Sequence, residues 1–461
     1  MITSYLKKKH HLFWEVFKSS WLLIAARIIN TTNSFFTMLL IAHLGPQELA
    51  AGALLTGSIT PLMTIAWTFI FSVGVYVGRV FGEGDSKKIG LIVRAGWIAA
   101  TILGTFIIVA LILLPGILQG LHQPPEILRI ISPYFVVFSL GVIPSLVFNC
   151  NQQFLLGIGR IKMVLLWSLY SLVTLCILGC SLVFSRYYST RTGIVSIAWI
   201  VSTMYWLVCL SQMAFIYFKR EFDSFEIFTY RFNSFVPVFA RLLQIGWGVS
   251  LQVGLEWITY GIGIIFMGFI NNTALASLQI IIQINLLLIM IPVGISHVGG
   301  IMVSQLIGRE DYRKAKEVSL ASMMIGIGFG TIISIIYVVF PDELISLYLD
   351  IKKPQNLEII KLTRALFIIA AISQWIDVIR TISIGLLRGY HDTQLRTWVG
   401  LVLSALTSIP IAYFLGFFLN YGAYGVRIGF LCSVLIGTIF SLYRLKHHKL
   451  GASLHTLEAT D

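Results

Sequence analysis

The chain has 461 residues, of which 57% are hydrophobic and 11% are charged, and its mean hydropathy is +0.87. An ordinary soluble domain carries about 25% charged residues, so this composition excludes a water-soluble fold. The formal net charge is +13. The basic residues occur in short clusters between apolar segments, not as a stripe along one polar face, and this distribution argues against a nucleic-acid partner.

Apolar runs recur along the chain from Trp21 to Tyr443. A helix needs about 20 apolar residues to cross a hydrocarbon core of about 30 Å. We therefore predict an all-α polytopic membrane protein whose surroundings are the lipid bilayer. Twelve transmembrane helices are expected at residues 21–43, 51–78, 92–116, 131–152, 163–184, 194–217, 240–268, 274–306, 318–345, 360–388, 395–420 and 422–444.

Basic residues divide unevenly between the two sides of this predicted membrane protein. Of the 33 Lys and Arg residues, 22 lie in the N-terminus or in connections that follow even-numbered helices. Seven lie on the opposite side: Arg129, Arg186, Arg191, Lys352, Lys353, Lys361 and Arg364. Because cytoplasmic loops retain Lys and Arg, both termini are predicted to face the cytoplasm, and the chain is expected in the cell inner membrane.

A charged connection from Lys219 to Ala240 divides the chain into halves of six predicted helices each. The predicted organisation is a cytoplasmic amphipathic N-terminus at 1–20 and an N-terminal bundle at 21–218. A cytoplasmic linker follows at 219–239, then a C-terminal bundle at 240–445 and a cytoplasmic tail at 446–461.

Two short segments repeat between the halves. Residues 77–88, VGRVFGEGDSKK, share valine, glycine, aspartate and lysine with residues 303–314, VSQLIGREDYRK, at an offset of 226 positions. Residues 155–160, LLGIGR, fall on residues 387–392, LRGYHD, at an offset of 232. Two six-helix units that both begin on the cytoplasmic side must be parallel repeats, which is an architecture of membrane transporters.

Only two carboxylates fall well inside a predicted transmembrane helix, namely Glu256 and Asp377. At a rise of about 1.5 Å per residue, Glu256 lies about 22 Å from Arg241 and Asp377 about 16 Å from Arg388, so both are near the midplane. A carboxylate there is unfavourable unless it is paired, hydrated or protonated. The pair is therefore a candidate site for Na⁺ or H⁺. The alternative is that Asp377 forms only a structural ion pair with Arg380, one turn away.

Other polar residues inside the predicted helices have two interpretations each. Gln279 and Gln283, one turn apart, could line a polar path beside Glu256 or form hydrogen bonds between helices. Arg27 could extend to the cytoplasmic surface or neutralise a partner charge. The sequence alone does not choose between these interpretations.

Sequence motifs for catalysis and metal binding are missing. The chain has no Walker A sequence, no HExxH and no GxSxG, so we expect neither an ATP-driven transporter nor one of these hydrolases, and no catalytic residue or bound cofactor. The five cysteines lie in apolar segments, where thiols behave as small hydrophobes. Cys176 and Cys180 are one helical turn apart, but no His or carboxylate shares their segment, so no metal site is expected.

The sequence resembles the multidrug and toxic compound extrusion (MATE) family over residues 20–445. The similarity is carried by AHLG at 42–45, ELAAG at 48–52, QFLLGIGR at 153–160, IPVG at 291–294, QWID at 374–377, LLRG at 386–389 and YGAYGV at 421–426. Each motif is short, and their order and spacing together make the resemblance specific.

The resemblance implies a cation site formed by acidic residues of helices seven and ten, and Glu256 and Asp377 stand at those positions. It also implies an aspartate in helix one, where this sequence has Thr37, with Asn33 nearby. Asn33 and Thr37 are therefore candidates for a cleft in the N-terminal half that lacks a titratable group.

The expected function is secondary antiport, in which Na⁺ or H⁺ enters while an amphipathic organic solute or drug leaves. Rocking of one bundle against the other would alternate access to the two sides. The expected partners are a small organic solute and the bilayer, with the protein as a monomer. The alternative is a flippase for a lipid-linked substrate, since related folds carry out that reaction.

Overall fold

The computed structural model describes residues 2–120, 125–183, 193–229, 235–351, 353–391 and 395–447. Within these ranges the chain is helical and contains no strand. The helices are α1 (Ile2–Ala42), α2 (Pro46–Glu83), α3 (Ser86–Gly120), α4 (Pro125–Gly157), α5 (Ile161–Val183), α6 (Gly193–Phe218), α7 (Phe235–Ile270), α8 (Asn272–Leu288), α9 (Met290–Gly308), α10 (Tyr312–Val339), α11 (Pro341–Ser346), α12 (Leu357–Gly389), α13 (Leu395–Tyr413) and α14 (Gly422–His447).

Ten helices among the described residues are long and apolar enough to cross a membrane, with α8 and α9 counted together as one span. Two further helices lie outside those ten. One is α1, whose middle carries Arg27, Asn30 and Asn33. The other is α13, whose second half continues into the π-helical turn Phe414–Phe418 as a shorter apolar helix, Leu406–Phe418. Each of the twelve predicted spans coincides with a helix or a pair of helices. The prediction of an all-α polytopic membrane protein is therefore confirmed.

The helix boundaries follow from local chemistry. The side chain of Asn271 accepts a hydrogen bond from the Ala274 amide at 2.7 Å and caps α8. The break between α8 and α9 falls at Ile289, just before Pro292, a residue that lacks the N–H of a regular helix. The long span predicted at 274–306 thus consists of two consecutive helices.

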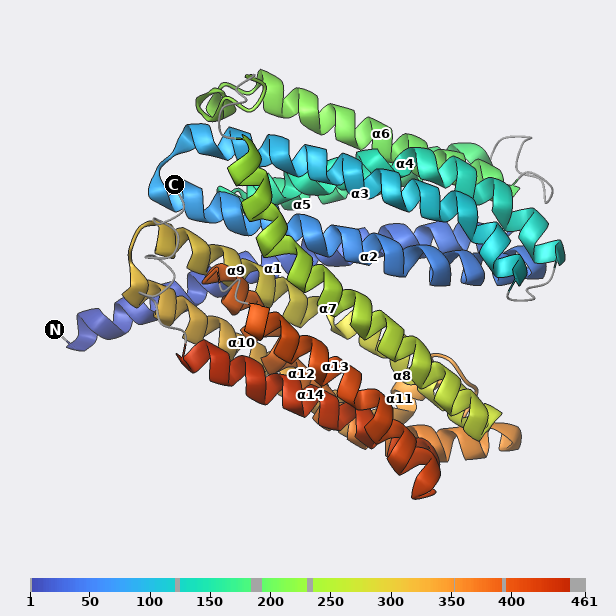
Figure 1. Ribbon diagram of the computed structural model, residues 1–461. Coiled ribbons are helices and arrows are strands. Elements are labelled where there is room, and N and C mark those ends of the chain that lie inside the picture. Colours follow the sequence, from blue (N-terminus) through green and yellow to red (C-terminus); the bar gives the residue numbers. More distant parts are fainter. Residues whose placement is uncertain are drawn as a thin grey trace. The chain divides into compact units, whose positions relative to one another are not determined.

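The chain forms two compact units. Residues 25–250 make up one, called here the N-terminal bundle. Residues up to 24 join those from 251 onward in the other, called the C-terminal bundle. The helices within each bundle run alongside one another (Figure 1). The division at 250/251 falls inside α7, downstream of the segment 219–239 that was predicted as a linker.

The first part of α1 belongs to the C-terminal bundle. Val16 and Ile24 are fully buried in one apolar cluster with Ile295 and Val303 of α9. Residues 2–20 are thus continuous with the first predicted span as one helix.

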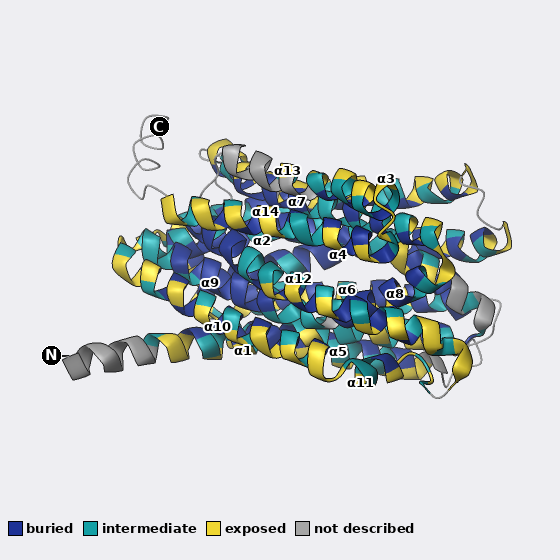
Figure 2. Ribbon diagram, turned by 90° about the horizontal axis from the view of Figure 1, so that it is seen from below, coloured by how far each residue is buried: buried dark blue, intermediate teal, exposed yellow. Residues whose placement is uncertain are grey.

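Figure 2 shows buried residues concentrated along α9 and exposed residues along α10. The predicted tail at 446–461 lies outside the described residues from 448 onward.

The segment predicted as a linker contains a short 3₁₀ helix, Arg220–Phe225, that packs within the N-terminal bundle. Phe222 and Phe225 are buried, with their ring centroids 5.6 and 5.5 Å from that of Phe154. Beside them, Lys219 donates to Glu221 at 3.0 Å, and this hydrogen bond lowers the pKa of the Glu221 carboxyl below its usual value. The first residues after α6 are therefore held to this bundle.

The two bundles repeat the same helix packing. In the N-terminal bundle, α4 packs against α2, α3 and α6, and α5 packs against α6. In the C-terminal bundle, α12 packs in the same way against α9, α10 and α14, and α13 packs against α14. The fourth predicted span is central in each bundle, as expected for an internal repeat.

Backbone detail follows the same repeat. Before α3, Gly84 has φ of 82° and the Asp85 carboxylate accepts from the Lys88 amide at 3.1 Å. Before α10, Glu310 has φ of 59° and Asp311 accepts from the Lys314 amide, also at 3.1 Å. Both pairs are 226 positions apart, so the offset found in the sequence marks the same left-handed turn and the same helix cap.

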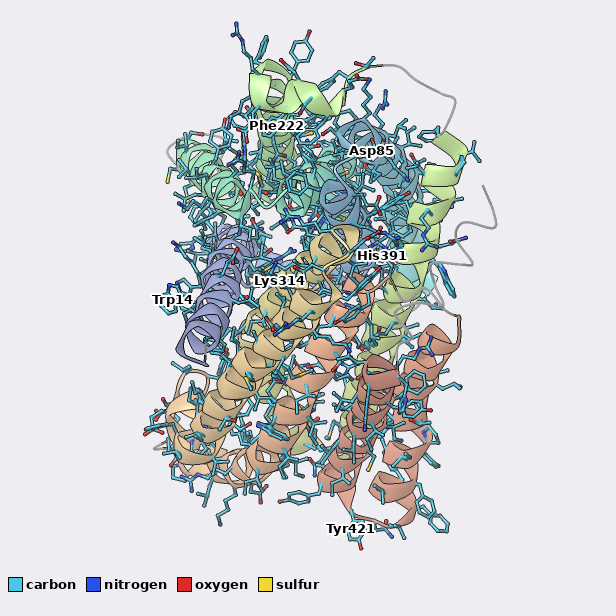
Figure 3. The ribbon with its side chains drawn as sticks, turned by 90° about the vertical axis from the view of Figure 1, so that its left-hand side faces the viewer. Trp14, Asp85, Phe222, Lys314, His391 and Tyr421 are labelled. Atoms are coloured by element: carbon cyan, nitrogen blue, oxygen red, sulfur yellow. The ribbon has the colours of Figure 1, made fainter. Side chains whose placement is uncertain are left out.

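The second offset marks a close helix crossing. A Cβ atom added at Gly157 would lie 2.9 Å from the Gly74 carbonyl oxygen, and one added at Gly389 would lie 2.3 Å from the Gly300 carbonyl oxygen. Glycine is required there because the backbones nearly touch. In Figure 3, Lys314 and His391 lie toward one end of the C-terminal bundle and Tyr421 at the other, so both repeated turns of this bundle share one end.

Candidate functional site

Glu256 on α7 and Asp377 on α12 meet on one guanidinium group, that of Arg380. Arg380 lies one helical turn after Asp377 and donates to the Asp377 Oδ1 atom at 2.7 Å. It also donates to the Glu256 Oε1 atom at 2.5 Å. One arginine therefore joins two carboxylates from helices that are more than a hundred residues apart in sequence.

The three side chains differ in their access to solvent. Asp377 and Arg380 are each 14% exposed, whereas Glu256 is 35% exposed. Gln252, one turn before Glu256, donates from its Nε2 atom to the same Glu256 Oε1 atom at 3.0 Å. Glu256 is thus the more open of the two carboxylates, and Asp377 the more enclosed.

The charges of this group do not cancel when both acids are ionised. Two carboxylates and one guanidinium leave a net charge of −1, which a proton or a monovalent cation would neutralise. Arg380 contacts one oxygen of each carboxylate, the Oδ1 atom of Asp377 and the Oε1 atom of Glu256.

This geometry contains both interpretations of the sequence. Glu256 and Asp377 do come together, as a coupled cation site requires, and Asp377 is also paired with Arg380, as the structural interpretation requires. What the sequence did not predict is that Arg380 contacts Glu256 as well. The role of the carboxylates in ion traffic remains a prediction.

Gln279 and Gln283 do not join this group. Both side chains are exposed on α8, and neither makes a hydrogen bond to Glu256 within the described part of the chain. The polar path proposed for them therefore stays a prediction.

The corresponding candidates of the N-terminal bundle form an uncharged group. Thr37 donates to the Asn33 carbonyl oxygen at 2.9 Å, and the Asn33 amide nitrogen donates to the Ser171 hydroxyl at 3.1 Å. Earlier in α1, the Arg27 guanidinium lies over the ring of Phe71, 4.6 Å from its centroid. A cation–π contact thus accompanies Arg27, in addition to the two roles considered from the sequence.

A second buried arginine was missed as a site residue. Arg427 on α14 is 8% exposed, and Tyr260 and Tyr337 lie within electrostatic range of it. The Tyr337 hydroxyl donates to the Asn285 Oδ1 atom at 2.5 Å. A single arginine inside an otherwise apolar span was the signal in the sequence, but it gave no indication of the surrounding tyrosines.

Comparison with known proteins identifies relatives along nearly the whole chain. The chain matches the MatE family over residues 23–182 and 249–414. It is 27% identical over 425 residues to the "Probable multidrug resistance protein NorM" of Rhizobium meliloti (strain 1021), with 91% of this chain and 89% of that protein covered. It is 25% identical to the "Multidrug resistance protein NorM" of Burkholderia vietnamiensis, with 92% and 91% covered.

Solved structures show the same fold. The eukaryotic MATE transporter AtDTX14 superposes with a TM-score of 0.85 at 15% sequence identity, covering 96% of this chain and 98% of that one. The Vibrio cholerae MATE transporter VcmN, in its bent form, gives a TM-score of 0.80 at 14% identity, covering 95% and 97%. The resemblance predicted from short motifs therefore extends to the complete fold.

Proposed function

Because the chain belongs to the MATE family of membrane transporters, we propose that it is a secondary antiporter that exports amphipathic organic solutes or drugs in exchange for Na⁺ or H⁺. The observation that carries the coupling is the shared contact of Glu256 and Asp377 with Arg380. Two acids and one base in a low-dielectric interior favour uptake of one further positive charge.

Coupling requires the ion to bind one conformation of the transporter better than the other. The contact between Arg380 and Glu256 links α7 to α12. A proton or a Na⁺ ion on Glu256 weakens that link, because the guanidinium then faces a neutralised group. Ion binding would therefore favour a different packing of these two helices, which alternating access can use.

The nature of the cargo is supported by the relatives. Of the two bacterial proteins named above, one is a multidrug resistance protein and the other a probable one, and a further structural neighbour, with a TM-score of 0.80, is a MATE protein in complex with MaD3S. These names favour export of small organic solutes over the flippase alternative. We propose the bacterial inner membrane as the location, and the monomer as the functional unit.

The decisive experiment is transport in proteoliposomes with Na⁺ and pH gradients imposed separately. Glu256→Gln and Asp377→Asn should each abolish gradient-driven export of a fluorescent amphipathic solute while the protein still inserts. The double variant should be scarcely worse than either single one, because the two residues act as a unit. Glu343→Gln, the same change at an exposed acid of α11, is the matched control and should transport normally.

Near-normal export by both single variants would leave the ion group as a structural element only. The gradient that drives export in the unaltered protein identifies the coupling ion, since Na⁺ and H⁺ are supplied independently.

Orientation is a separate part of the proposal, in which both termini face the cytoplasm. Ser224 lies exposed in the short helix after α6, and Ser346 lies exposed at the end of α11, on opposite sides of the predicted topology. In a background without the five native cysteines, a cysteine at Ser346 should react with an impermeant reagent added to intact cells, and one at Ser224 should not. The reverse pattern would invert the topology.

A further inference from the structure

Arg427 lies in an apolar layer of the C-terminal bundle. It is in the second turn of α14, and its neighbours Val426 and Ala423 are 0% and 5% exposed. Val426 packs in one buried cluster with Leu278 and Ile281 of α8. An arginine in such surroundings loses its hydration, and a buried charge without a partner is strongly unfavourable.

In the described part of the chain, Arg427 forms no salt bridge, and its buried Nε atom has no hydrogen-bond partner. Its electrostatic neighbours are Tyr260 and Tyr337, whose phenols are uncharged near neutral pH. The two interior carboxylates, Glu256 and Asp377, are already bound to Arg380. Arg427 therefore lacks the compensating charge that Arg380 has.

The contrast between the two arginines indicates what Arg427 is suited to bind. A guanidinium presents a planar fork of donors that matches a carboxylate in a bidentate arrangement. The neighbouring side chains are apolar or aromatic, with Tyr260 and Phe430 packed against the same buried cluster as Val426. The group that would neutralise Arg427 is thus an acid attached to an apolar or aromatic body.

We propose that Arg427 binds the carboxylate of the transported solute, so that the preferred cargo is an amphipathic organic acid or a zwitterion. This assignment rests on the proposed export function and specifies its substrate class. Tyr260 lies within electrostatic range of both Asp377 and Arg427. Because Arg427 is 8% exposed, the acid reaches it in a conformation in which this layer has opened.

The test compares three probes that share one aromatic body and differ in charge: pyrenebutyrate, pyrenebutanol and pyrenebutylamine. Binding to the purified full-length protein in detergent is measured by fluorescence anisotropy. The unaltered protein should bind pyrenebutyrate about tenfold to a hundredfold more tightly than pyrenebutanol, the range expected for a hydrogen bond between charged groups. Arg427→Gln should bring the ratio of the two dissociation constants close to one.

Two further variants make the test specific. Arg427→Lys keeps the charge but not the bidentate fork, so it should keep part of the preference. Arg364→Gln removes an exposed arginine of the same bundle that is paired with Asp342, and it should leave the preference unchanged. Thermal melting and size-exclusion profiles establish that each variant is folded. If Arg427→Gln does not fold, Arg427→Lys and Tyr260→Phe carry the test, and both should reduce the preference.

An unaltered protein without preference for the anionic probe would overturn the proposal. So would a folded Arg427→Gln variant that keeps the preference, or a preference abolished by chloride at the concentration of ordinary buffers. The binding assay needs no ion gradient. If the unaltered protein shows no preference for pyrenebutyrate but still exports pyrenebutanol under an ion gradient, only the assignment of Arg427 is refuted. If the Arg427-dependent preference is present but no gradient drives export, only the antiport is refuted.

Discussion

The N-terminal and C-terminal bundles share a backbone plan and differ in the chemistry of their interiors. The turn before α3 and the turn before α10 each have a residue with left-handed backbone, Gly84 and Glu310, followed by an aspartate that caps the helix. The crossing at Gly157 is repeated at Gly389. The candidate sites differ in charge: Glu256, Asp377 and Arg380 form a charged group in the C-terminal bundle, whereas the contacts of Thr37 and Asn33 in the N-terminal bundle are hydrogen bonds between neutral groups.

This difference separates what the scaffold needs from what transport needs. Turns, caps and close glycine contacts are requirements of the fold, so both bundles keep them. The N-terminal bundle adopts the same packing without such acids, so the fold itself does not require them. We infer that the ion chemistry belongs to one bundle, and the following predictions probe that asymmetry.

The largest expected effect is that of Arg380→Gln. Removing the shared guanidinium leaves Glu256 and Asp377 as neighbouring charges without their partner, and breaking a fully buried pair typically lowers stability by about 3–5 kcal/mol. We expect about 3 kcal/mol, since Glu256 is 35% exposed and partly hydrated. The loss should appear as a lower melting temperature in detergent.

The double variant Arg380→Gln with Asp377→Asn is the control for that prediction. Removing one of the two like charges should recover part of the lost stability. A double variant less stable than Arg380→Gln alone would show that the arginine acts through packing and not through charge.

Next in size are the helix crossings. A methyl group added at Gly389 would lie 2.3 Å from the Gly300 carbonyl oxygen, and one at Gly157 would lie 2.6 Å from a Val77 methyl group. Overpacking of this kind typically lowers stability by about 1–3 kcal/mol. Gly389→Ala should be the more damaging change, because backbone yields less readily than a side chain. Gly328→Ala on α10, with nothing within 4 Å of the added atom, is the control and should be neutral or stabilising.

The repeated caps should give equal and smaller effects. Asp85→Ala and Asp311→Ala each remove a side chain that accepts from a backbone amide at a helix start, and each should lower stability by about 1 kcal/mol. Thermal unfolding of the two variants side by side measures this. A large difference between them would mean that the two turns are not equivalent.

Asp311 adds a pH dependence. Hydrogen bonds from the Lys314 ammonium and the Lys314 backbone amide lower the pKa of the Asp311 carboxyl from its usual value. The stabilisation is therefore fully present above the unfolded-state pKa of about 3.9 and is lost as the pH falls through the lower folded-state value. The difference in melting temperature between Asp311→Ala and the unaltered protein should vanish in strong acid.

The smallest effect is expected at Thr37. Its hydroxyl donates to the carbonyl oxygen one turn earlier in its own helix, so Thr37→Ala should change stability by less than about 0.5 kcal/mol. Ion-driven export should keep its dependence on the coupling gradient, with at most a change in solute affinity. Loss of the ion dependence in this variant would place part of the ion site in the N-terminal bundle.

Much of the scaffold was predictable because its signals are local. The spans follow from apolar runs measured against the thickness of a bilayer. The offsets of 226 and 232 residues identified equivalent turns because a left-handed residue and an aspartate cap depend on a few consecutive residues. The depths of Glu256 and Asp377, counted along straight helices, stay a prediction.

The sequence by itself thus determined the helical spans, the internal repeat and the two interior acids. The tertiary structure decided that Arg380 contacts both acids and that Arg427 is buried within electrostatic range of Tyr260 and Tyr337. It also decided that residues before Ala25 pack with the C-terminal bundle. Which side chains meet depends on the rotation and crossing of each helix. Those are fixed by close packing between segments distant in sequence, and hydropathy and periodicity within one segment do not report them.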